Sequence, residues 1–446
     1  MVTVRSGGSA TGPPRSPLTD SEPWAGGRDR WNSEALFIMA LEWTDGKALF
    51  ASKSSRQDFL VWLANDANIP VRSTVARNPN TPPWILSLLA ADASEAVRKQ
   101  VATHPDVPWE VLRILSADCD KYVRMAVGSS PNTALPMLET LASDEESVRY
   151  GVASNPSTPI RILEKLSSDK SAQVRVAVAS NASSPSAILE FLGADSNHQT
   201  SWTAIESIGV RNSVAVNPNS SEKILKSLAS DEESVRDGVA SNVKCPVQLL
   251  ETLARDKSRL VRMAVASNPN SSEDVLHSLS EDEDELVRIN AGSNPRTTAQ
   301  TLTGLVKDLS SNVREVVAIN PRTPTVLLET LALDENPLVR AKVARNPDTP
   351  LAHLAKLSKD VFEVRLRVAE NPNLPVEFLE SFASEEDFRC RAAVALNPNS
   401  AEPMLESLSA DGDSRVRRAV ASNSKTPLSI LETVARTDGI WAVIGS

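Results

Sequence analysis

Apolar and polar positions follow one short pattern along most of this chain, and the pattern recurs fourteen times. It runs Val-Arg, two variable residues, Val-Ala, one variable residue, Asn-Pro, a Thr-Pro step, and a leucine-rich run that ends at Asp. Apolar residues three and four apart predict amphipathic helices, and no stretch has the strict alternation of a strand. Each copy of the pattern therefore predicts two short helices joined by tight turns.

The copy from Val148 to Asp169 shows how each helix begins and ends. Val148 and Val152 form an apolar i, i+4 pair on the first helix, which should stop at Asn155-Pro156 because proline lacks an amide donor and restricts the residue before it. We expect Thr158 to cap the second helix and Pro159 to stand at its first position. Asp169 follows the second helix and leads into the next copy.

The spacing of the pattern arginine predicts how the copies assemble. It is 25 or 26 residues everywhere except for 36 residues between Arg175 and Arg211. A unit this short cannot bury its own apolar face, so it must stack on its neighbours and form a solenoid. The arginines are Arg72, Arg98, Arg124, Arg149, Arg175, Arg211, Arg236, Arg262, Arg288, Arg314, Arg340, Arg365, Arg391 and Arg417.

Three polar positions recur so regularly that they need an explanation of their own. Arg stands in all fourteen copies, and Asn and the Asp after the second helix each stand in twelve; His104 and Ser130 replace the Asn. A row of arginines could bind phosphates, but aspartates at the same period favour a structural ladder of Arg to Asp pairs, with Asn side chains bonded to turn backbone. The ladder residues on which we base this prediction are Arg149, Arg175, Arg236, Arg262, Asp144, Asp169, Asp231, Asn155 and Asn268.

The segments outside the regular pattern divide the chain. Residues 1–32 are rich in Gly, Pro, Ser and Thr and predict a disordered tail, whereas 33–66 predict an aromatic, helical N-terminal cap. Residues 67–438 form the solenoid, interrupted by an insertion at 196–209 that we expect to be a loop folded back on the scaffold. Residues 439–446 predict a C-terminal cap.

Departures from the pattern are the candidate partner-binding positions. The insertion contributes Trp202 and Ile205, and the variable positions after the arginine contribute Met125, Tyr150 and Met263. These variable residues would line a groove if the first helix faced the concave side, and would be core if it faced inward. Trp441 lies in an apolar C-terminus that either closes the last copy or docks on a second copy of the chain.

The repeated unit at 71–92 and 339–360 resembles the leucine-rich repeat variant family of bacteria. That resemblance implies a strand-free, right-handed superhelix in which an α-helix alternates with a second helix that is often 3₁₀. The period here is longer than that of the family, which leaves room for both helices to be α. A described member carries an N-terminal cysteine cluster for an iron-sulfur centre, but this chain has no cysteine before Cys119, so no cofactor is carried over. HEAT-like repeats are the alternative fold.

Composition, charge and the lack of catalytic motifs limit the classes of function that we expect. A net charge of −10 argues against nucleic acid, and neither a secretory signal nor an apolar run of membrane-spanning length is present. Widely separated Cys119, Cys245 and Cys390 predict free thiols and, with no signal, a cytoplasmic protein. Neither a metal-ligand spacing nor a catalytic motif is found. We therefore expect a non-catalytic scaffold for a protein or peptide, with a HEAT-like nucleic-acid-binding array as the second hypothesis and a metal or redox role as the third.

Overall fold

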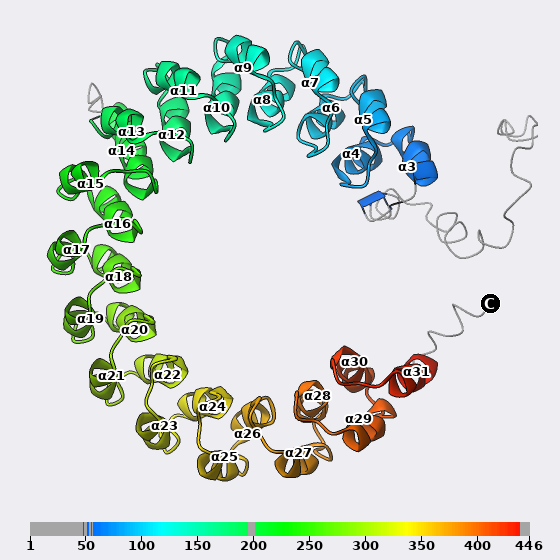
Figure 1. Cartoon of the computed structure of the whole chain (residues 1–446), viewed down its shortest axis with the longest axis vertical. Helices are drawn as coiled ribbons and strands as arrows, with labels where there is room; N and C mark the ends of the chain where they lie inside the picture. Colours follow the sequence, from blue (N-terminus) through cyan, green and yellow to red (C-terminus); the bar gives the residue numbers. More distant parts are fainter. Residues whose placement is uncertain (1–47, 49–50, 53–54, 56, 195–200, 438–446) are drawn as a thin grey trace, which may run out of the picture. The chain divides into compact units, whose positions relative to one another are not determined.

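A computed structural model of the chain describes residues 48, 51–52, 55, 57–194 and 201–437, with helix bounds for 29 α-helices. Within these residues there is no strand and no 3₁₀ helix, so both helices of each repeat are α. The chain is an all-α helical repeat solenoid (Figure 1). The predicted tail, most of the predicted N-terminal cap and the C-terminal segment 439–446 lie outside the described residues.

The residues divide into two compact units, 1–157 and 158–446, and each is described by itself. The helices of the first unit are α3 (Gln57–Ala64), α4 (Ile69–Arg77), α5 (Pro83–Leu89), α6 (Glu95–Ala102), α7 (Trp109–Leu115), α8 (Lys121–Ser129), α9 (Leu135–Leu141) and α10 (Glu146–Ser154). The helices of the second unit are α11 (Ile160–Ser167), α12 (Ala172–Ser180), α13 (Ser186–Gly193), α14 (Ser201–Val216), α15 (Glu222–Leu228), α16 (Glu233–Ser241), α17 (Val247–Leu253), α18 (Arg259–Ser267), α19 (Glu273–Leu279), α20 (Glu285–Ser293), α21 (Ala299–Leu305), α22 (Ser311–Ile319), α23 (Thr325–Leu331), α24 (Pro337–Arg345), α25 (Leu351–Leu357), α26 (Phe362–Ala369), α27 (Val376–Phe382), α28 (Phe388–Leu396), α29 (Glu402–Ser409), α30 (Ser414–Ser422) and α31 (Leu428–Thr437).

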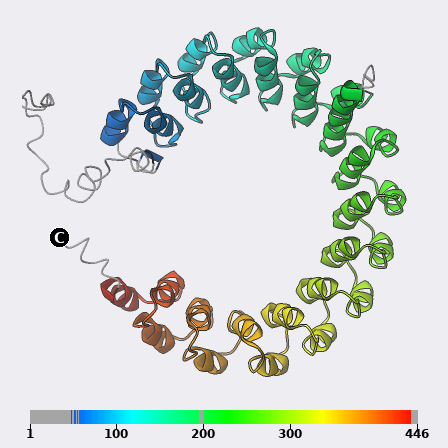
Figure 2. The same cartoon turned by 180° about the vertical axis from the view of Figure 1, so that it is seen from behind.

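The even-numbered helices from α4 to α30 are the first helices of the repeats and carry the pattern arginine. Within each unit, successive first helices pack closely on one another, whereas the odd-numbered second helices make less contact between repeats. Figures 1 and 2 show the first helices as the inner layer of each unit and the second helices as the outer layer. The inner layer is therefore one continuous helical surface within each unit.

Packing between the layers supplies the stability that such short helices lack. Most of the helices have only 7–9 residues, and isolated helices of that length are unstable in water. In α18 Val261 and Val265 are fully buried, and Leu276 and Leu279 of the adjoining α19 are buried against the same interior. Each such side chain contributes about 1.5–3 kcal/mol when it is fully buried.

The turn between the helices differs in one respect from the expectation. Pro159 is the N-cap of α11 and not its first residue, and its side chain offers no cap bond. At the position equivalent to Thr158, the hydroxyl of Thr349 donates to the carbonyl of Val343 at the end of the preceding first helix, 2.6 Å away. The hydroxyl at this position therefore bonds back to the preceding first helix, because it stands one residue before the N-cap. Ser271 makes the same bond to Val265 although serine, not proline, follows it.

The insertion is also different from the expected loop. Residues 201–216 form the single helix α14, which is longer than the other first helices and carries the arginine of its repeat, Arg211. Residues 195–200 lie outside the described residues. The described extra residues of the insertion thus lengthen a first helix at its N-terminal end.

Candidate binding surface on the first helices

The pattern arginines form two-pronged bonds to the carboxylate that follows the second helix of the same repeat. Nε of Arg236 lies 2.7 Å from Oδ2 of Asp256, and Nη2 lies 2.9 Å from Oδ1. Two parallel bonds of this kind are the strong form of an arginine to carboxylate contact. Corresponding pairs are Arg72–Asp92, Arg98–Asp118 and Arg124–Asp144 in the first unit, and Arg211–Asp231, Arg262–Asp282, Arg288–Asp308, Arg314–Asp334, Arg340–Asp360, Arg365–Glu385 and Arg391–Asp411 in the second.

Each carboxylate residue also links two repeats through its backbone. Nη1 of Arg262 donates to the carbonyl oxygen of Asp256, 2.9 Å away, while the carboxylate of Asp256 is held by Arg236. The same carboxylate accepts a bond from the amide of Ser258. Hydrogen bonding by Arg236 holds the pKa of Asp256 below its ordinary value of 3.8 although burial opposes this shift.

The other residues assigned to the ladder form hydrogen bonds to backbone groups of the turns. Nη1 of Arg149 donates to the carbonyl of Asp144, and Nη1 of Arg175 donates to that of Asp169. Nδ2 of the buried Asn155 donates to the carbonyls of Gly128 and Ser130 in the preceding repeat. Nδ2 of Asn268 likewise donates to the carbonyls of Ala240 and Asn242, and its Oδ1 accepts from the amide of Asn270.

The predicted partner-binding residues are dispersed. Tyr150 is 41 % exposed and Ile205 is 62 % exposed, whereas Met125 and Met263 are half-buried. Met125 and Tyr150 stand at the same position of the neighbouring helices α8 and α10 in the first unit. Trp202 belongs to α14 but its side chain lies outside the described residues, as does the whole of Trp441.

The position two residues before the pattern arginine is exposed in most of the first helices, and the repeated pattern did not single it out. It lies on the exposed face of the first helix together with the residues four and seven positions further on. In α18, α20 and α24 of the second unit it holds Leu260, Leu286 and Leu338, which are 47 %, 43 % and 51 % exposed; we call these residues the apolar row. Asn312 of α22 stands at the same position between the last two leucines. Half-buried Met263 and Ile289 lie beside the row on α18 and α20. The signal in the sequence was leucine at this position in a protein whose other surface positions are mostly polar.

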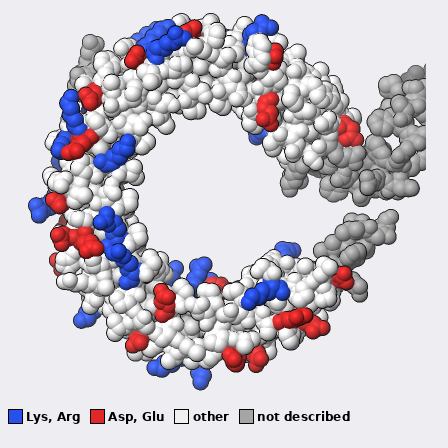
Figure 3. Space-filling model, in the orientation of Figure 1, with Lys and Arg blue, Asp and Glu red and all other residues white. Residues whose placement is uncertain are grey.

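Charge changes along the same surface. The first helices α24, α26, α28 and α30 carry 10 Lys and Arg, with three on α24, two each on α26 and α28 and three on α30, against a single carboxylate, Glu363. The first helices α16 to α22 carry five cations and four carboxylates. The second helices α25, α27 and α29 carry one Lys and four Glu. Figure 3 shows this separation, with Lys and Arg on the inner side of these repeats and Asp and Glu over α27 and α29.

Two exposed arginines of this surface are stacked on phenylalanines of the preceding repeat. The guanidinium carbon of Arg389 lies 4.4 Å from the ring centroid of Phe362, and that of Arg415 lies 3.3 Å from the centroid of Phe388. Stacking on an aromatic ring fixes a guanidinium in place and covers one face of the ring.

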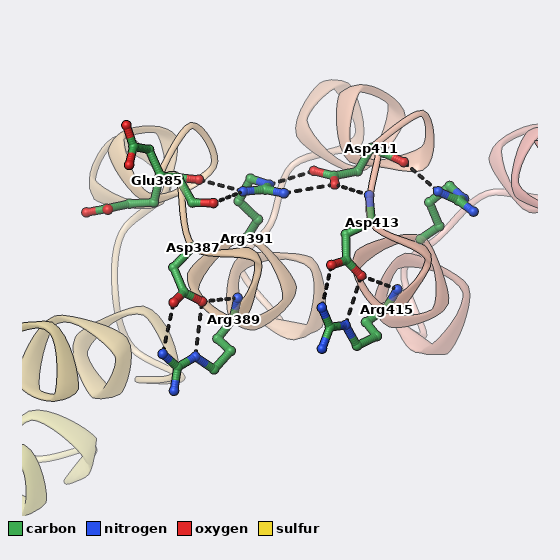
Figure 4. Close-up of polar contacts among 9 residues, drawn as sticks. Glu385, Asp387, Arg389, Arg391, Asp411, Asp413 and Arg415 are labelled. Atoms are coloured by element: carbon green, nitrogen blue, oxygen red, sulfur yellow. Dashed lines mark hydrogen bonds and ion pairs between the residues drawn. The ribbon is translucent and has the colours of Figure 1, made fainter.

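The same two arginines are also held by carboxylates at the beginnings of their own helices. Asp387 accepts bonds from the amide, Nε and Nη2 of Arg389, and Asp413 does the same for Arg415 (Figure 4). Hydrogen bonds from these arginines lower the pKa of each carboxyl to about 2. Both guanidinium groups are thus immobilised from two sides.

A cavity of about 470 Å³ opens beside Arg389. Three arginines line it, Arg345, Arg367 and Arg389, which come from α24, α26 and α28; we call it the arginine cavity. Its apolar lining includes Leu366, Phe388 and Leu396, and the one carboxylate in the lining is Glu370.

A second cavity of about 400 Å³ lies at the beginning of the apolar row. Its lining includes Leu260 and the carboxylates of Glu232, Glu233 and Asp237. Burial, followed by the charge of Glu233, raises the pKa of Asp237 above its ordinary value. The inner layer from α16 to α28 therefore has an acidic cavity at one end, leucines on α18, α20 and α24 with Asn312 on α22, and the arginine cavity at the other end.

The first unit has a different exposed surface, on its second helices. Trp62, Trp84 and Trp109 are 49 %, 53 % and 56 % exposed on α3, α5 and α7. Of the three, only Trp62 falls in the segment 33–66 that the sequence predicts to be an aromatic cap, and its side chain is about half exposed.

A search of the described residues found no group of three His, Cys, Asp or Glu side chains that could hold a metal ion. Cys119, Cys245 and Cys390 are free cysteines. No helix among the described residues is both long enough and apolar enough to cross a membrane.

Comparison with known proteins gives similarities to solved structures only. No protein-family model and no curated protein matches it. Among solved structures, it is similar to a leucine-rich repeat variant with a novel repetitive structural motif, at 26 % identity over 51 % of this chain and 89 % of the other, with a TM-score of 0.36. UNC-45 from Drosophila melanogaster matches at 13 % identity over 92 % of this chain and 67 % of its own, with a TM-score of 0.27.

Kap121p, in a crystal structure bound to Pho4p, matches at 11 % identity and a TM-score of 0.24. The match covers 92 % of this chain and 48 % of Kap121p, so the chain spans about half the length of that protein. All three TM-scores are below 0.5, and the description of this chain as a helical repeat solenoid rests on its own helices.

Proposed function

We propose that this protein is a non-catalytic scaffold whose second unit binds an extended segment of a partner protein along the inner layer of first helices. The observation that carries the proposal is the apolar row of Leu260, Leu286 and Leu338, which lies at one repeated position and is about half exposed. The same position holds Ser234 in α16 and Asn312 in α22, so the repeat does not require an apolar residue there. Apolar side chains grouped on one exposed face mark candidate interaction sites.

The spacing of the row fits an extended peptide. Neighbouring packed helices lie roughly 10 Å apart, and an extended chain advances about 3.3 Å per residue. A bound segment would therefore present about every third residue to successive repeats. Each leucine that is covered would contribute on the order of 1 kcal/mol, so several repeats are needed for useful affinity.

The pattern arginines are not part of this binding surface. Their side chains are only 10–18 % exposed in the Arg–Asp pairs of the second unit, and their donors are taken by carboxylates and carbonyls. The pattern arginines instead stabilise the repeats that carry the surface. On this surface the HEAT-like nucleic-acid hypothesis would need an aromatic platform for bases, but Phe362 and Phe388 are covered by arginines. The exposed tryptophans lie elsewhere, on the second helices of the first unit.

Selection of peptides from a random display library by the intact chain tests the proposal. The peptides enriched on the wild-type chain should lose binding to a variant with Leu260→Asp and Leu286→Asp. They should keep it with the matched control Val326→Asp, because Val326 is 62 % exposed on α23 in the outer layer. Failure to enrich peptides, or equal binding to both variants, would refute the proposed function.

A further inference from the structure

We infer that the arginine cavity is the pocket that selects an acidic residue in the bound peptide. This inference rests on the proposed function and adds the chemistry of the partner. Arg345, Arg367 and Arg389 approach one cavity from three successive first helices, so the pocket forms only where these three repeats stack.

The arginines of the cavity keep donors for a ligand. An arginine has five N–H donors. Arg389 uses Nε and Nη2 for Asp387, and Arg367 uses Nη1 and Nη2 for Glu370 and Glu363. Nη1 of Arg389 and Nε of Arg367 have no hydrogen-bond partner among the described residues.

Of the three arginines that line the cavity, Arg345 is the one whose charge is least neutralised by nearby carboxylates. It is exposed at the last position of α24, and no carboxylate in the described part of the chain lies within ion-pair distance of it. A carboxylate that enters the cavity would therefore gain a full guanidinium partner without breaking an existing pair. Such charge-assisted bonds are short and strong.

The cavity is also preorganised. The guanidinium of Arg389 is fixed by the ring of Phe362 and by Asp387, and that of Arg367 is fixed by Glu363 and Glu370. Of these carboxylates only Glu370 lines the cavity, so the others orient the arginines from outside. Binding to groups that are already held in place costs less side-chain entropy.

The occupant that fits is a Glu or Asp side chain with apolar neighbours. Leu366, Phe388 and Leu396 give the cavity an apolar lining that suits the methylene groups of glutamate and an adjoining apolar residue. A nucleic-acid strand fits less well, because Glu363, Asp387 and Asp413 alternate with the arginines and would repel successive phosphates.

Fluorescence anisotropy with labelled synthetic peptides tests the inference on the full chain. The probe is a peptide of about 15 residues with leucine at every third position and glutamates near one end, matched by analogues with glutamine or lysine in place of glutamate. We expect the glutamate peptide to bind about tenfold more tightly than the glutamine peptide at low salt, and this difference to fall as salt rises.

Arg345→Ala should remove most of that tenfold preference, whereas the control Arg255→Ala, at an exposed arginine after α17, should retain it. Equal binding of the glutamate and glutamine peptides, or a preference that survives Arg345→Ala, would overturn the acidic pocket. In that case loss of both peptides on Leu286→Asp would still support the proposed function. If none of the three peptides binds at millimolar concentration, or if a single-stranded oligonucleotide of similar length binds more tightly than the glutamate peptide, the inference is also wrong.

Discussion

The guanidinium of Arg262 donates two hydrogen bonds to the carboxylate of Asp282, from Nε to Oδ2 at 2.7 Å and from Nη2 to Oδ1 at 2.9 Å. Its remaining nitrogen donates to the carbonyls of Asp256 and Lys257 in the preceding turn. Arg262 is only 9 % exposed, so its removal would leave a partly buried carboxylate and two carbonyls without these partners.

We therefore predict that Arg262→Ala lowers the free energy of unfolding by about 2–3 kcal/mol. Urea denaturation followed by far-UV circular dichroism measures this change. Arg262→Lys should also destabilise the protein, because an ammonium cannot make both parallel bonds. The exposed Arg255→Ala is the control and should change stability by less than about 0.5 kcal/mol. An Arg262→Ala midpoint equal to that of the wild type would refute the structural role of the ladder.

A second prediction concerns the asparagine position, where the second repeat has histidine. Nε2 of His104 lies 2.9 Å from the carbonyl of Asn78, and its Nδ1 accepts from the amide of Asp106. Asn268 makes the equivalent bonds, because its Nδ2 donates to the carbonyl of Asn242 and its Oδ1 accepts from the amide of Asn270. We expect His104→Asn to change the unfolding free energy by less than about 1 kcal/mol and Asn268→Ala to lower it by about 2 kcal/mol.

Chemical denaturation of both variants measures these changes in the free energy of unfolding. Asn268→Asp is the informative companion, because a carboxylate keeps the acceptor but loses the two donors, and it should be at least as damaging as alanine. If Asn268→Ala were as stable as the wild type, the carbonyls of Ala240 and Asn242 would not depend on this side chain.

The helical repeat could be predicted from the sequence because it depends on local rules. The i, i+4 valines, the Asn-Pro break and the leucine run each act within one repeat, and α10 and α11 fall where the copy from Val148 to Asp169 predicted two helices. The α-helical form of the second helix, which the family resemblance left open, follows from the longer period.

The proposed binding surface was harder to predict because it depends on neighbouring repeats. The stack of Arg389 on Phe362 joins residues from different copies, and neither residue belongs to the repeated pattern. The arginine cavity likewise needs Arg345, Arg367 and Arg389, which occupy three different positions of the pattern. Comparing equivalent positions of the repeats cannot find a cluster whose members occupy different positions in successive copies. A helical-wheel projection across adjacent copies can find it.

A third prediction concerns the stability of the protein at acidic pH. Hydrogen bonds from Arg236, Arg340 and Arg391 hold the pKa values of Asp256, Asp360 and Asp411 below the ordinary 3.8 in the folded state. Groups whose pKa is lowered by folding add stability that is complete above the ordinary pKa and is lost as pH falls through the folded value. The urea midpoint should therefore decline steeply below about pH 4.

Denaturation at a series of pH values tests this, with Asp256→Asn as the comparison. The variant should be less stable at neutral pH and should lose less additional stability on acidification, because it has no carboxylate to protonate at this position. A wild-type midpoint that stays constant down to about pH 3 would contradict the pKa assignment.

The last prediction uses two glycines in different surroundings. A Cβ at Gly151, which is buried where α10 packs on α8, would collide with the backbone carbonyl oxygen of Met125, whereas a Cβ at the exposed Gly304 in α21 would meet nothing within 4 Å. Gly304→Ala should raise the unfolding free energy by about 0.5–1 kcal/mol because it removes backbone freedom from the unfolded chain. Gly151→Ala should lower it by about 1–3 kcal/mol, since backbone cannot move aside as a side chain can. Thermal and urea unfolding of the two variants, measured side by side, should therefore change in opposite directions. A stabilising Gly151→Ala would mean that α8 and α10 do not approach each other as closely as the structure shows.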